Sequence, residues 1–128
     1  MARAVVACDD CAVLLLDSIT EIRPEDAGQI VVAGSHGGGS AVRYALAVPL
    51  LGCFFNDAGI GKDHAGISGL SLLACPTLAY SHASARIGDA ADGWQNGIVT
   101  ALNGDAQAAG LKTGMTVQAA ARLLLRRG

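Results

Sequence analysis

The sequence predicts an α/β fold: a single three-layer domain over residues 1–128, with a mainly parallel sheet of four or more strands and helices on both faces. Three observations predict it. The 128 residues are enough for one domain. Short apolar segments alternate with helix-like segments along the chain. Only four charged residues lie between Gly28 and His82, which is typical of strands buried on both faces.

The strands are expected in five places. The segment from Arg3 to Leu16 holds two apolar runs around a short acidic turn, which fits a hairpin or a bent strand. Ser18 and Glu21 then match a capping box, although Pro24 limits any helix there to about one turn. Four continuous apolar runs predict further strands at residues 28–33, 52–55, 77–80 and 97–102.

Helices are expected between these strands and at the end of the chain. Ser40 can cap a helix over residues 40–48, and Asp63 can cap one over residues 64–74; a proline follows each. Two glycines inside the second segment lower its helix propensity. The last segment follows Thr116, and its apolar residues at positions 117, 120, 121, 124 and 125 form one helical stripe.

Composition excludes several classes of protein. Apolar residues make up 52% of the chain and charged residues 16%, which excludes a disordered chain. The net charge of −2 provides no basic excess for nucleic acid. The longest nearly apolar run, residues 44–55, is shorter than the about 20 residues of a membrane span. We therefore expect a cytoplasmic protein that binds neither nucleic acid nor membrane, and its sparse charge favours a homo-oligomer.

The four cysteines carry one recognisable pattern. Cys8 and Cys11 match C-x-x-C, which occurs in redox pairs and in half-sites for zinc. The two aspartates between them disfavour a thiolate, and no second C-x-x-C completes a zinc site. The sequence therefore assigns this pair no role, while Cys53 and Cys75 are expected to be small core residues.

Ligands of parallel sheets bind outside the carboxyl ends of the strands, so the polar residues there are the candidate site. The first such end contains Ser35, His36 and three glycines. The amides of Gly37, Gly38 and Gly39 can form a cradle for a carboxylate, a phosphate or a developing oxyanion. The alternative is a flexible turn.

The second end is the densest polar cluster of the chain. Lys62, with Asp57, is the candidate base or electrostatic partner, and Asn56 can donate a further hydrogen bond. The alternative is that Lys62 pairs with Asp57 or Asp63 and only holds the loop. The spacing of a nucleotide-binding phosphate loop is absent here.

The third end supplies a nucleophile and an anchor. Ser84 or Ser35 is the candidate nucleophile, and Arg86 can bind a substrate carboxylate. Alternatively, Ser81 and Ser84 cap a helix and Arg86 pairs with a nearby aspartate.

All three histidines, His36, His64 and His82, lie in these loops. They are candidate acids or bases, with His36 assigned to catalysis, or alternatively ligands of a metal together with Asp57 or Asp63. Because no pair has helical i, i+4 spacing, we assign no metal and no cofactor.

These residues together predict an enzyme of small molecules, a hydrolase or a related acid–base enzyme acting on a carbonyl- or carboxylate-bearing metabolite. The alternatives are a non-catalytic small-molecule-binding domain, a subunit of a larger enzyme complex, and a shell-forming protein.

Overall fold

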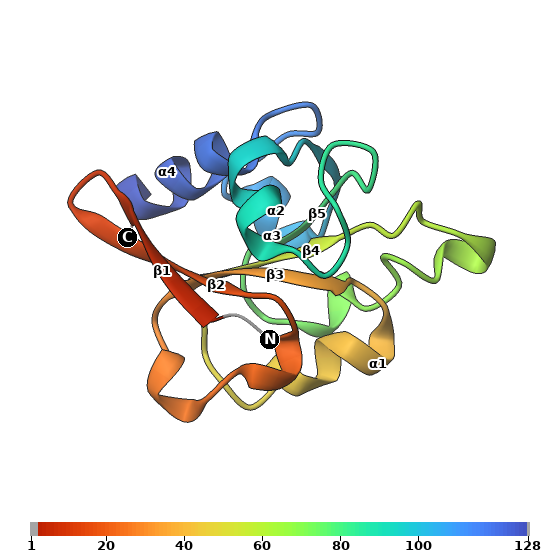
Figure 1. The fold of residues 1–128 in the computed structure, drawn as a ribbon, viewed down its shortest axis with the longest axis horizontal. Coiled ribbons are helices and arrows are strands. Elements are labelled where there is room, and N and C mark those ends of the chain that lie inside the picture. Colours follow the sequence, from red (N-terminus) through yellow and green to blue (C-terminus); the bar gives the residue numbers. More distant parts are fainter. Residues whose placement is uncertain (1–2, 128) are drawn as a thin grey trace.

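A six-stranded mixed sheet forms the centre of the computed structural model, which describes residues 3–127 (Figure 1). The strands lie side by side in chain order, and the four inner ones are parallel, whereas β1 and β6 run antiparallel to their neighbours. Their bounds are β1 Arg3–Cys8, β2 Cys11–Leu16, β3 Ile30–His36, β4 Gly52–Asn56, β5 Thr77–Tyr80 and β6 Val99–Leu102.

The helices are four in number among the described residues, and three of them are short. They are α1 Gly39–Val42, α2 Ala90–Asn96, α3 Gly104–Ala108 and α4 Val117–Arg127. Five single 3-10 turns supplement them at Ile19–Glu21, Pro24–Asp26, Arg43–Ala45, Lys62–His64 and Leu70–Leu72. None of the helices in the described part of the chain is long and apolar enough to cross a membrane.

Two apolar cores lie on the two faces of the sheet because neighbouring residues of a strand point to opposite faces. In β3, Ile30 and Val32 belong to the core that α2, α3 and α4 cover, and Val31 and Ala33 belong to the core beside α1. Figure 1 shows α2 and α4 above the sheet and α1 below it. The α/β class is therefore confirmed, but the sheet is mixed and α1 with 3-10 turns covers the lower face, not a full layer of helices.

Most predicted elements are present. The opening segment forms the β1–β2 hairpin, and strands overlap all four of the other predicted runs. The last helix is confirmed, and Thr116 Oγ1 accepts a hydrogen bond from the Ala119 amide in its first turn at 3.1 Å. The helix expected over residues 40–48 is α1 continued by one 3-10 turn.

The helix expected over residues 64–74 is wrong. This segment contains only the end of one 3-10 turn and a second turn at Leu70–Leu72. The reason is close packing: a Cβ on Gly66 would lie 1.9 Å from the carbonyl oxygen of Asp57. Gly66 and Gly69 thus allow backbones to touch, Gly69 against Gly38, instead of extending a helix.

Candidate active site at the carboxyl edge of the sheet

The carboxyl ends of β3, β4 and β5 lie together at one edge of the sheet, as predicted. The amide of Gly37, after β3, donates to the carbonyl of Asn56 in β4 at 3.2 Å. The amide of Asp57, after β4, donates to the carbonyl of Tyr80 in β5 at 2.8 Å. Because β6 is antiparallel, it brings Thr100 to the same edge from the opposite direction.

Asp57 is the centre of this edge. Its carboxylate is buried, and the residue is 4% exposed. Oδ1 accepts hydrogen bonds from the amides of Gly59 at 2.7 Å and His82 at 3.0 Å. Oδ2 accepts one from the hydroxyl of Thr100 at 2.7 Å. Asp57 therefore ties the end of β4 to the segment after β5 and to β6.

These contacts decide the charge of Asp57. Burial acts to raise the pKa of its carboxyl group, but the hydrogen bonds from Thr100, Gly59 and His82 favour the anion and together hold the pKa below the ordinary value. Asp57 is consequently a buried anion at neutral pH, surrounded by donors.

Among the described residues, His82 is the only histidine, lysine or arginine whose side chain lies within 4 Å of this carboxylate. Its Nδ1 lies 3.4 Å from Asp57 Oδ1, and its side chain is 59% exposed. The ring also packs over Gly59, where an added Cβ would lie 3.4 Å from ring carbon Cε1. The buried carboxylate thus faces one ring nitrogen and leaves Nε2 available to a molecule in solvent.

A shallow pocket with a volume of about 410 Å³ begins at this ring. Arg86 lines the same pocket, and the Arg86 amide donates to Asp92 Oδ2 at 2.7 Å, which fixes the backbone there. The Arg86 side chain is exposed and forms no ion pair with any described residue. We name this site the His82 pocket; it is lined by His82, Ala83, Ser84, Ala85, Arg86, Ile87 and Asp92.

The loop after β4 has an unusual backbone. Ala58, Ile60, Asp63 and His64 have φ between 51° and 66°, in the left-handed region. This region is costly for a β-branched residue such as Ile60. Hydrogen bonds hold the loop in this form, including that from the Gly66 amide to the carbonyl of Ile60 at 2.7 Å. Figure 1 shows the loop projecting from the sheet, and strained backbone of this kind is concentrated at functional sites.

His36 lies on a second small pocket, formed by the same loop, with a volume of about 200 Å³. Ala58 and Ile60 line it on the loop side. His36 Nδ1 accepts a hydrogen bond from the amide of Gly38 at 3.0 Å, so the ring is oriented by its own turn. His36 and His82 thus face different pockets, and the loop at residues 58–60 lies between them.

Several predicted site residues have structural partners. Asn56 is fully buried; it donates to the carbonyl of Ala85 and accepts from the amide of Ala58. Ser84 Oγ donates to the carbonyl of Ser81 at 2.8 Å and accepts from the amide of Ile98 at 3.0 Å. Ser35 Oγ accepts from the amide of Ile19 at 2.9 Å. In this arrangement Asn56 has no exposed surface, and the two serine hydroxyls bind backbone groups of other segments.

The alternative reading, in which Lys62 forms an ion pair with Asp57 or Asp63, is not seen among the described residues. Lys62 is exposed on the projecting loop, and the partners of Asp57 are Gly59, His82 and Thr100. The physical reason is the left-handed path of residues 58–61, which carries the lysine away from the strand end.

The three glycines after β3 also serve the backbone. The amide of Gly37 donates to the carbonyls of Asn56 and Gly66, and that of Gly38 donates to His36. Two of the three amides of the expected anion cradle therefore donate hydrogen bonds within the chain. The amide of Gly39 stays a candidate donor to an anion. His36, His64 and His82 do not assemble either: the described residues contain no group of three or more His, Cys, Asp or Glu side chains placed to hold a metal ion.

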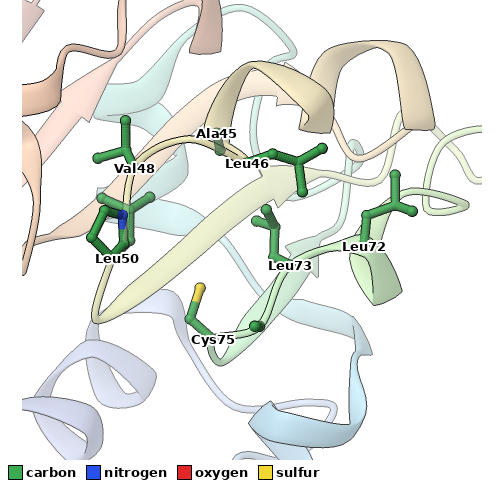
Figure 2. Close-up of a pocket in the computed structure, with 9 residues that line it drawn as sticks. Ala45, Leu46, Val48, Leu50, Leu72, Leu73 and Cys75 are labelled. Carbon is green, nitrogen blue, oxygen red and sulfur yellow. The ribbon is translucent and has the colours of Figure 1, made fainter.

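A separate pocket with a volume of about 300 Å³ lies at the opposite edge of the sheet, where β4 and β5 begin. Figure 2 shows Leu50, Leu73 and Cys75 around it. It carries no charged side chain and so offers no acid or base. We name it the apolar pocket; its lining is Ala45, Leu46, Val48, Pro49, Leu50, Leu72, Leu73, Ala74 and Cys75.

Of the contributors to the carboxyl edge, the sequence analysis did not single out His82 and missed Thr100 altogether. His82 was one of three histidines named as candidate acids or bases, and its position two residues after β5 was the available signal. Thr100 carried no signal, because its contact with Asp57 depends on β6 being antiparallel.

No protein-family model, curated protein or solved structure matches this chain.

Proposed function

We propose that the chain is an acid–base enzyme that acts on a small carbonyl compound bearing a carboxylate, with His82 as the group that moves the proton. One observation carries the proposal: an exposed imidazole held against a buried, ionised carboxylate lines the same pocket as an unpaired arginine. Asp57 orients the ring, as the carboxylate of a catalytic triad orients its histidine. His82 is the catalytic residue, and Asp57 is a positioning residue.

The substrate class follows from Arg86 and from the shape of the pocket. A guanidinium binds a carboxylate through two parallel hydrogen bonds. The pocket is shallow, so it suits a small molecule with one reacting carbonyl group next to its carboxylate. A proton can then be removed beside the carbonyl, or a water molecule activated to attack it, by the Nε2 atom of His82.

A first test uses pyruvate in deuterated water. Exchange of its methyl hydrogens requires a base beside the carbonyl, and proton NMR follows it directly. We expect the protein to accelerate exchange above the buffer rate, and His82→Gln to abolish the acceleration. His64→Gln is the matched control, because His64 is an exposed histidine outside the His82 pocket, and it should retain full activity.

The same samples separate hydrolysis from binding alone. Hydrolysis of nitrophenyl acetate that depends on His82 but not on His64 supports water activation. If pyruvate shifts the NMR signals of His82 and Arg86 while neither reaction exceeds the buffer rate, the protein is a binding domain and the enzyme proposal fails.

The apolar pocket favours a second candidate function, the binding of a small apolar ligand. Its volume of about 300 Å³ lies at the lower end of ligand-binding pockets, and its lining is apolar apart from one thiol. A thermal shift with indole or naphthalene that is lost in Leu73→Glu would support this candidate. The His82 pocket should be unaffected by that substitution.

We also propose that copies of the chain associate. Large apolar side chains are exposed at Val5, Tyr44, Leu46 and Leu72, and their exposed fractions range from 42% to 63%. Such exposure is typical of association surfaces when it forms a patch. Sedimentation velocity over a wide concentration range tests the proposal, and a monomer at every concentration would refute it.

A further inference from the structure

Cys8 and Cys11 face each other across the β1–β2 hairpin. They are the last pair in the register of the two strands, joined by the turn at Asp9 and Asp10. Residues opposed in an antiparallel pair have Cα atoms about 4.5–5.5 Å apart, with side chains on the same face. A disulfide requires a Cα separation of about 4.4–6.8 Å. The register of the hairpin therefore places the Cα atoms of two free cysteines within the range that a disulfide requires.

The two thiols differ in exposure. Cys8 is 2% exposed and belongs to the apolar core beneath α4, whereas Cys11 is exposed. An oxidant in solution therefore meets Cys11 first, and the buried Cys8 is placed to react only with its opposite neighbour. Cys11 is thus placed as the attacking cysteine and Cys8 as the resolving cysteine.

The structure also adds a positive charge that the sequence pattern did not show. Arg122 of α4 lies beside the turn, with Nε 3.8 Å from Asp9 Oδ1. Burial raises the pKa of the Cys8 thiol, while Arg122 acts in the opposite direction. The acidic turn is thus partly compensated by the helix packed against the hairpin.

We propose that Cys8 and Cys11 form a reversible dithiol–disulfide site that is oxidised by a hydroperoxide. The Cys11 thiolate attacks a peroxide oxygen, the O–O bond breaks, and Cys11 becomes a sulfenic acid as hydroxide leaves and takes up a proton. Cys8 sulfur then attacks Cys11 sulfur, the S–O bond breaks, and water leaves as the disulfide forms. Two thiols lose two electrons and two protons, and hydrogen peroxide is reduced to two water molecules.

The short connection fits a reversible site better than a structural one. A disulfide stabilises a fold more when it closes a longer segment of chain, and only two residues lie between these cysteines. Its formation therefore adds little to stability, and a small thiol can reduce it again. The inference is independent of the proposed acid–base function.

Peroxide treatment followed by alkylation and peptide mapping tests the proposal. Trypsin leaves Cys8 and Cys11 in one peptide, residues 4–43. Cleavage after Arg43 separates this peptide from Cys53, and cleavage after Lys62 separates Cys53 from Cys75. We expect the oxidised protein to lose two alkylation sites, both in the first peptide, with that peptide lighter by two hydrogen atoms. Dithiothreitol should restore both sites.

Two variants control the experiment. In Cys11→Ser, Cys8 should remain reduced and be alkylated fully after unfolding. In Cys75→Ser, which removes a partly buried cysteine elsewhere, the first peptide should oxidise as in the unaltered protein. A sulfinic acid on Cys11 with Cys8 still reduced would overturn the proposal, and so would a link from Cys8 to Cys53 or Cys75.

Discussion

The carboxylate of Asp57 depends on individual donors, and Thr100 is the one that can be removed most cleanly. Thr100→Val deletes the bond to Oδ2 and nearly preserves the shape of the side chain. We expect the free energy of unfolding to fall by about 1–3 kcal/mol, because a buried charged acceptor loses its partner. The pKa of Asp57 should rise at the same time, since this hydrogen bond lowers it. Urea denaturation and a carboxyl NMR titration measure the two effects.

Thr113→Val is the matched control for that change. Thr113 is exposed in the turn between α3 and α4, so its replacement should alter stability by less than about 0.5 kcal/mol. Equal losses in the two variants would show that the hydrogen bond to Asp57 contributes nothing particular.

Gly66 is the second position where one atom matters. In Gly66→Ala the new Cβ would lie 1.9 Å from the carbonyl oxygen of Asp57, so backbone must move. We expect a loss of about 1–3 kcal/mol, as for other overpacked sites, and a disturbed His82 signal in NMR spectra. In Gly104→Ala nothing lies within 4 Å of the new Cβ, and stability should be unchanged or slightly higher. Similar losses in both would contradict this account.

Among the elements, α4 packs closely against the sheet. Leu124 is 2% exposed, and a Cβ on Gly52 of β4 would lie 2.8 Å from its Cδ1. We expect Leu124→Ala to lower the free energy of unfolding by about 2–5 kcal/mol, because it opens a cavity between α4 and β4. Arg126→Ala, on the exposed side of the same helix, should leave the urea midpoint almost unchanged.

Elements with a regular apolar period were predictable from the sequence. The apolar stripe of α4 marks a helix with one buried face, and the continuous apolar runs of β3 and β4 mark strands buried on both faces. In each case the spacing of the apolar residues indicates the type of element. The prediction of a helix over residues 64–74 was wrong because the local helical signals compete with a tertiary contact, that of Gly66 with the carbonyl oxygen of Asp57. The direction of β6 could not be predicted either, since an apolar run does not encode whether its neighbour is parallel.

The candidate site was predictable as a place but not as a set of partners. Polar loops after three parallel strands must meet at one edge, and these do. Which side chains pair there depends on the path of each loop, and the left-handed loop separates Lys62 from Asp57 and leaves His82 as the partner. The hydrogen bonds of Ser84 could not be predicted for a related reason: a serine in a loop binds backbone as readily as substrate.

At the scale of the whole molecule, a second buried carboxylate links the edge strand β1 to the turn after β2. Asp26, in the turn after β2, accepts two hydrogen bonds from Arg3 of the edge strand β1 and one from the amide of Arg23. Its side chain is 2% exposed. The hydrogen bond from Arg3 is the main cause that lowers the pKa of Asp26, against the opposing effect of burial. Asp26 and Asp57 are therefore both anions that the folded state favours.

This arrangement makes stability depend on pH in a definite direction. A carboxyl group whose pKa is lower in the folded state stabilises the protein above its unfolded pKa of about 3.9, and that contribution disappears as the pH falls through the folded pKa. The free energy of unfolding should therefore decrease as the pH falls below about 4, because the unfolded chain binds protons at these carboxylates more readily than the folded chain does.

Asp26→Asn isolates one half of that effect. At neutral pH the variant should be less stable by about 1–3 kcal/mol, because the amide of asparagine cannot accept both bonds from Arg3 and carries no charge. Below about pH 4 the gap should narrow, since protonation removes the same charge from the unaltered protein. Urea midpoints measured across this range give the gap directly, with Asp10→Asn as an exposed control that should show none at any pH. If the difference in stability between the variant and the unaltered protein stayed constant below about pH 4, Asp26 would stabilise the protein through its shape and not through its charge.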